Sequence, residues 1–126
     1  MANMTKTSRR LGVGKHAVIF DGVTQQPSAR YGKSVLVWKF INPDGVVEII
    51  SGVSAADGTV CGSMLSLITG VEVGQTADPD LMIGHEFSCL IEQVGDHRTT
   101  TITSPSGASV TTGNGGAGGN GGFDVG

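Results

Sequence analysis

Basic and aromatic side chains lie close together between residues 30 and 39, and one further arginine lies far beyond them. Guanidinium and ammonium groups neutralise phosphates, and aromatic rings stack on nucleobases with a contribution of about 1–3 kcal/mol per base. These residue types therefore indicate a surface that could bind a polyanion with exposed bases. The candidate binding residues are Arg30, Tyr31, Lys33, Trp38, Lys39 and Arg98.

Each candidate also has a purely structural interpretation. Trp38 shares one face of a predicted strand with Leu36 and Phe40, a pattern that favours the core over a stacking surface. Tyr31 precedes Gly32 in a polar stretch and is the better stacking candidate. Single lysines and arginines are typical of any solvated surface, so the cations argue for binding only if the fold gathers them on one face.

The charge distribution is uneven along the chain. Seven of the eight lysines and arginines lie in the first 39 residues, whereas ten of the eleven acidic residues lie beyond them. The net charge of −3 excludes a protein that is basic overall. Such an asymmetry predicts a local basic surface, and the alternative is that the charges simply decorate solvated faces.

A hairpin with an aromatic face organises these residues. The apolar residues alternate from Leu36 to Phe40, which is the period of a half-buried strand. Asn42-Pro43-Asp44-Gly45 is a turn signal, because proline presets one dihedral and glycine accepts a positive φ. Residues 46–50 then form the returning strand.

The remaining elements complete a mainly β chain. Residues 16–23 predict the first strand, with a bulge or bend at Gly22. Residues 59–70 carry a helical apolar stripe, with Asp57 or Thr59 as the N-cap and Gly70 as the end. Residues 87–92 and 99–103 predict the last two strands.

This order places one short helix between the third and fourth of five strands. It is the chain order of the OB-fold, a five-stranded Greek-key barrel of the all-β class. Barrels of this kind bind ligands on the face of strands 2 and 3 and on the loops joining strands 1–2 and 4–5. The first of those loops would carry Arg30, Tyr31 and Lys33, and the second would carry Arg98.

Three segments follow from composition. Residues 1–13 predict a flexible basic arm, residues 14–103 the folded domain, and residues 104–126 a disordered tail rich in Gly, Ser, Thr and Asn. Nine of the last 23 residues are glycine, and such a segment buries too little apolar surface to offset its ordering entropy. The tail remains available to contact other proteins.

Catalytic, metal and membrane functions find little support in the sequence. Gly12-Val13-Gly14-Lys15 resembles a phosphate loop, but Arg9 and His16 stand where that loop needs glycine and a hydroxyl residue. The histidines and cysteines lack metal-ligand spacing, and Cys61 and Cys89 are best interpreted as small buried residues. We expect no enzyme, no cofactor, no metal, no membrane span and a cytoplasmic location.

Several positions together resemble small OB-fold proteins that occur in phage and bacterial genomes and include single-stranded DNA-binding proteins. The resemblance covers residues 14–103 and rests on Gly14, His16, Phe20, Gly22, Val23, Tyr31, Gly32, Trp38, Phe40, Asp80, Leu81, Ile83, Gly84 and Phe87. It implies an OB-fold domain acting in DNA replication, recombination or repair. The Gly-rich tail is similar to that of bacterial single-stranded DNA-binding proteins, but Phe123-Asp124-Val125-Gly126 departs from their acidic tip.

The sequence therefore predicts a non-catalytic protein that binds single-stranded DNA with little sequence preference. DNA is favoured over RNA as the partner, and an RNA-binding domain of the same fold stays open as an alternative. The alternative is a structural or protein-interaction module of OB type, for example a component of a phage-related assembly. Open strand edges also predict self-association into a homo-oligomer.

Overall fold

The computed structural model describes residue 4, residues 9–28 and residues 32–115. It contains a single antiparallel sheet of six strands and one α-helix, so the mainly β class is confirmed. The elements are β1 (Gly14–Ser28), β2 (Lys33–Asn42), β3 (Gly45–Ser51), α1 (Val60–Thr69), the 3-10 helix η1 (Pro79–Met82), β4 (Glu86–Val94), β5 (His97–Thr103) and β6 (Ser109–Gly115).

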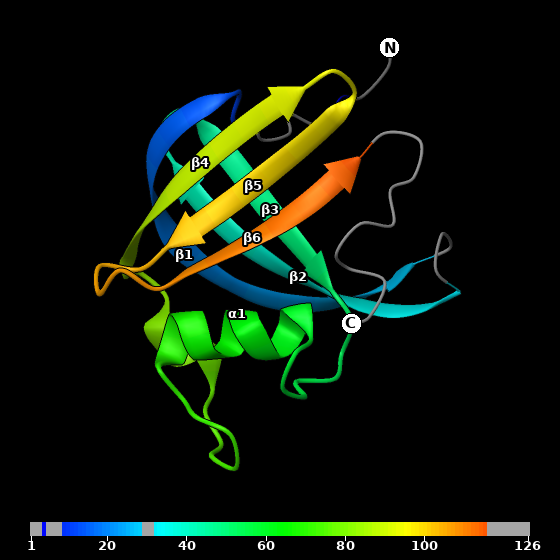
Figure 1. The fold of residues 1–126 in the computed structure, drawn as a ribbon, viewed down its shortest axis with the longest axis vertical. Helices are drawn as coiled ribbons and strands as arrows, with labels where there is room; N and C mark the ends of the chain where they lie inside the picture. The colour runs from blue at the N-terminus through cyan, green and yellow to red at the C-terminus, as the bar shows by residue number, and fades with distance from the viewer. Residues whose placement is uncertain (1–3, 5–8, 29–31, 116–126) are drawn as a thin grey trace.

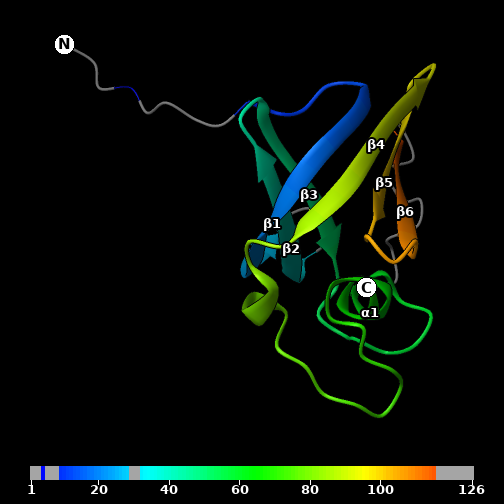
Figure 2. The ribbon, with the colours of Figure 1, turned by 90° about the vertical axis from the view of Figure 1, so that its left-hand side faces the viewer.

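The strand order in the sheet is β3-β2-β1-β4-β5-β6. The long strand β1 belongs to both halves, because its first part pairs with β4 and its later part pairs with β2. The register shifts between Phe20 and Gly22, which confirms the predicted bulge, and Gly22 adopts a φ of 109° that side chains rarely allow. The two halves curve round a common core, with α1 across one end (Figures 1 and 2).

The core contains the aromatic face predicted for β2. Phe20, Phe40 and Phe87 lie on three different strands with ring centroids 5.4–6.5 Å apart, a range typical of tilted and edge-on aromatic pairs. Trp38 is only 1% exposed, and its Nε1 donates a hydrogen bond to Ser51 Oγ at 2.9 Å. Trp38 is therefore a core residue, and the interpretation of it as a stacking surface is wrong.

Helix α1 confirms the predicted caps. Thr59 has an extended backbone, and its side chain accepts a hydrogen bond from the backbone N–H of Gly62. Gly70 ends the helix in the left-handed region, with its N–H bonded to the carbonyl of Ser66. The buried side chains of the helix belong to the apolar core, and they include Met64 and Ile68.

The prediction of a five-stranded OB-fold barrel is not confirmed. The sixth strand, β6, lies in the stretch 104–126 for which a disordered tail was predicted, and the sheet does not close. The cause is local pattern rather than composition: Val110, Thr111 and Thr112 are β-branched and pair in register with β5. Val110 packs against the core opposite Ile102.

The segment before β1 is tied to the edge of β3. The N–H of Leu11 donates to the carbonyl of Val46 at 2.9 Å, and the N–H of Val46 donates to the carbonyl of Arg9 at 2.8 Å. The Leu11 side chain is 3% exposed and belongs to the core. The predicted flexible arm over residues 1–13 thus contains an anchored part from Arg9 onward, which crosses the end of the sheet opposite α1 (Figure 2).

We predict that Leu11→Ala lowers the free energy of unfolding by about 2–3 kcal/mol, because it removes a buried side chain and leaves a cavity. Urea unfolding followed by circular dichroism measures the change. Val13→Ala is the matched control, since Val13 is 59% exposed and should change the stability little. An equal effect of the two substitutions would contradict the assignment of Leu11 to the core.

Candidate functional site

The structure separates several residues that the sequence grouped together. Arg30 and Tyr31 lie outside the described residues. Lys33 is exposed at the start of β2, whereas Lys39 lies further along β2 on the face opposite Trp38 and Phe40. Arg98 lies on β5, where its register with Gln93 places it on the face that carries Cys89, Ile91 and Ile102.

Lys39 is not free of partners. Its Nζ lies 3.8 Å from Asp21 Oδ2, and both side chains are about two-fifths exposed. A solvated ion pair of this kind contributes little to stability and is open to competition by another anion. Lys39 pairs in register with Glu48 of β3, so it lies one strand away from the edge of the sheet.

That edge borders a pocket on the concave side of the curved sheet. We call it the seam pocket; it is a cavity of about 100 Å³ between β3 and β5, with Leu11 and Ile91 among its lining residues. Its polar and charged lining consists of Arg10, Glu48, Arg98 and Thr100, and Ile50 adds an apolar surface. The pocket therefore brings together an arginine from the N-terminal segment and an arginine from β5.

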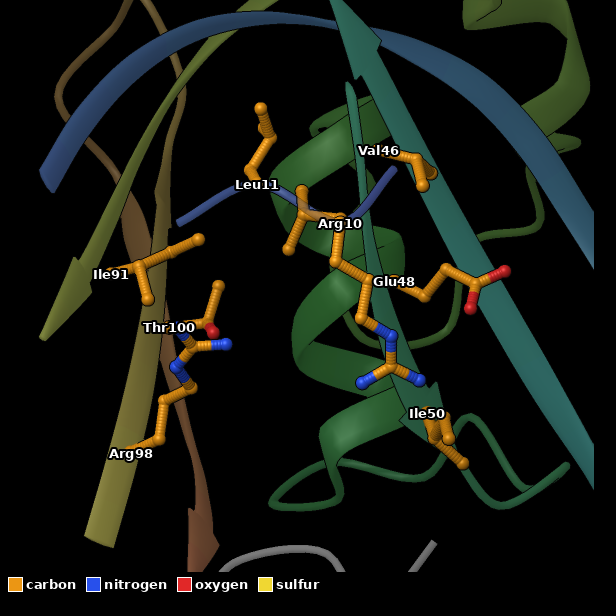
Figure 3. A pocket seen from close by; sticks show the side chains of 9 residues that line it. Arg10, Leu11, Val46, Glu48, Ile50, Ile91, Arg98 and Thr100 are labelled. Atoms are coloured by element: carbon orange, nitrogen blue, oxygen red, sulfur yellow. The ribbon is translucent and has the colours of Figure 1, made fainter. Parts of the chain in front are cut away.

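The two arginines extend their guanidinium groups into the seam pocket from its two sides (Figure 3). The carboxylate of Glu48 points to the side opposite Arg98 (Figure 3). Nε of Arg98 is buried and has no hydrogen-bond partner among the described residues. A buried N–H without an acceptor is unfavourable, so an oxygen atom supplied by water or by a ligand would stabilise this side chain.

Sequence reasoning found Arg98 but missed Arg10. Residues 1–13 show no periodic spacing of hydrophobic residues, so the sequence predicts a flexible arm that includes Arg10. The signal that identifies it is Leu11, a large apolar residue between Arg10 and Gly12 that has to be buried somewhere. The structure thus places Arg98 beside Arg10, which is not among the six binding residues predicted from the sequence.

A more open pocket is lined by Arg9, Arg10, His16 and Asp44, among others, and none of these side chains has a buried polar atom without a partner. No group of three or more His, Cys, Asp or Glu side chains that could hold a metal ion occurs in that part of the chain. His16 Nε2 lies 2.7 Å from the carbonyl oxygen of Gly12, which ties the ring to the local backbone. Within the described residues, the helices are too short or too polar to cross a membrane.

The two cysteines are buried, as predicted, and neither is a disulfide partner. Burial raises the pKa of the Cys89 thiol to about 11, and it also raises the pKa of Cys61, where a hydrogen bond with Ser51 acts in the opposite direction. Because only the thiolate is a strong nucleophile, neither cysteine is activated for covalent chemistry at neutral pH.

Comparison of the chain with protein-family models, curated protein sequences and solved structures finds no match.

We predict that a disulfide reagent such as DTNB reacts very slowly with the native protein at pH 8 and rapidly in denaturant. A pKa near 11, instead of 9.0, lowers the thiolate fraction of Cys89 about a hundredfold, and burial slows access further. Absorbance of the released thiol follows both reactions. Fast native labelling of Cys89, located by peptide mass spectrometry, would contradict the buried, protonated state.

Proposed function

We propose that this protein binds single-stranded DNA with little sequence preference, and that the seam pocket holds the phosphate backbone. The observation that carries the proposal is the convergence of Arg10 and Arg98, which come from opposite parts of the sequence, on one cavity. Arginine presents several N–H donors in a planar fork that matches phosphate oxygens.

The order of the first five strands supports an OB-type architecture for this function. β1 pairs with both β2 and β4, β4 pairs with β5, and the helix lies between β3 and β4 in the chain. The OB-fold is a partly open barrel that binds oligonucleotides on its strand 2–3 face. We propose that the protein is such a barrel, extended by β6 and left open between its two unpaired edge strands, β3 and β6.

The proposed path of the DNA follows from this architecture. It runs from the seam pocket across the outer face of β3 and β2, where Lys39 supplies the next cation. Stacking by Tyr31 remains a prediction, because the loop joining β1 and β2 lies partly outside the described residues. A role in replication, recombination or repair in the cytoplasm follows from this proposed activity, and the protein needs no catalytic group for it.

The alternative is a protein-interaction module, and one observation favours it. The cations do not all gather on one face, because Lys33, Lys39 and Arg98 lie at different places in the sheet. Binding through two or three cations is weaker than binding through a continuous basic groove. Failure to bind DNA at low salt would favour the interaction module.

We predict that Arg98→Gln and Arg10→Gln each weaken binding of a fluorescent oligo-dT about tenfold, since each removes a charge-assisted hydrogen bond. Fluorescence anisotropy at several salt concentrations measures this, and each loss should reduce the salt dependence by about 0.7 in log–log slope. Lys15→Gln is the matched control, because Lys15 is exposed on β1 and does not line the seam pocket.

Two results would reject the seam pocket as the DNA site. The first is no binding by a protein that circular dichroism shows to be folded. The second is an equal loss in Arg98→Gln and Lys15→Gln, which would indicate a diffuse electrostatic effect rather than a defined contact.

We also predict that Tyr31→Ala weakens oligo-dT binding by about 1–3 kcal/mol, whereas Tyr31→Phe retains most of the affinity. Stacking needs the ring and not the hydroxyl group, so the conservative variant separates stacking from hydrogen bonding. The same anisotropy titration provides the measurement. Wild-type affinity in Tyr31→Ala would remove Tyr31 from the binding surface.

A further inference from the structure

The two edges of the six-stranded sheet are protected very differently. The β3 edge carries the charged residue Glu48, and the backbone of residues 9–11 occupies part of it through two hydrogen bonds to Val46. The β6 edge consists of Ser109-Val110-Thr111-Thr112-Gly113-Asn114-Gly115, without a charge or a proline. Proteins that stay monomeric protect such edges with charges, prolines, bulges or a covering element. Residues 109–115 carry none of the first three, and helix α1 lies beside the start of β6.

The alternation of hydrogen-bonded and non-hydrogen-bonded residue pairs between β5 and β6 shows which backbone groups of β6 point away from β5. The N–H of Ser104 donates to the carbonyl of Ala108 at 2.8 Å, which makes that pair a hydrogen-bonded one. Pairs alternate along an antiparallel ladder, so Thr103–Ser109 and Thr101–Thr111 are non-hydrogen-bonded pairs. The 2.8 Å contact between the hydroxyls of Thr101 and Thr111 agrees, because side chains approach most closely in such pairs.

It follows that the N–H and C=O groups of Ser109, Thr111 and Gly113 point away from β5. They form a row of donors and acceptors at the regular spacing that another β-strand needs. All seven residues of β6 pair with β5 without a register shift, so the outer row is also regular. This edge fits an extended backbone and not a compact ligand.

We propose that β6 pairs antiparallel with β6 of a second copy of this chain, forming a closed, two-fold symmetric dimer. A second copy fits because the strand is uncharged, so identical residues that meet across the two-fold axis do not repel each other. The contact closes because residues 9–11 cover the start of the β3 edge at Val46 and Glu48 places a charge further along it, and both features oppose head-to-tail growth of β6 onto β3. The dimer then contains one continuous twelve-stranded sheet, twice the six strands of one copy.

The proposal is independent of DNA binding and is tested on the full chain by analytical ultracentrifugation from about 1 to about 200 µM. We expect a concentration-dependent species at twice the chain mass of 12.8 kDa. Thr111→Lys should give a monomer, because two lysines meet near the two-fold axis. Thr101→Lys is the matched control: it breaks the same hydroxyl contact and adds the same charge one strand away from the edge, and it should remain a dimer.

Three outcomes would overturn the proposal. The first is a wild-type protein that stays monomeric over the whole concentration range. If the backbone N–H of Thr111 is also protected from hydrogen exchange at every concentration, another part of the same chain covers the edge. Masses that grow beyond the dimer would show open association. A dimer that persists in Thr111→Lys, with circular dichroism unchanged, would place the interface elsewhere.

Discussion

The packing of Phe20 against Phe40 and Phe87 is the interaction on which the rest of the structure depends. Phe20 lies where β1 leaves β4 and joins β2, and its two partners come from those neighbouring strands. The bulge at Gly22 lets the strand bend at this point, so both halves of the sheet share one apolar core. Without that bend the sheet would be flatter, and β3 and β5 would not border the same pocket.

The pocket between β3 and β5 is the consequence of this bend. The sheet curves enough to bring β3 and β5 to either side of one pocket, although its two unpaired edges belong to β3 and β6, and the N-terminal segment adds Arg10 and Leu11 to the lining of the pocket. Leu11 supplies apolar contact toward the core, while Arg10 remains beside the pocket. A single stretch of chain therefore completes the core and positions a cation, which couples the stability of this end of the protein to its proposed binding chemistry.

The features that the sequence predicted correctly are those determined by neighbouring residues. The alternation around Trp38, the caps at Thr59 and Gly70 and the bulge at Gly22 each depend on a pattern within a few positions. The features that it missed depend on distant partners. Leu11 is buried because of Val46, and β6 exists because its short β-branched run matches the register of β5, although glycines dominate the composition of the tail.

The same distinction applies to charge. Counting showed that cations are concentrated in the first third of the chain, but a count does not decide which of them share a surface. Lys39 is engaged by Asp21, whereas Arg98 lines a pocket together with Arg10, so the two cations differ in their surroundings. The proposed binding role therefore depends less on the net charge than on the curvature of the sheet, because that curvature places two arginines beside one cavity.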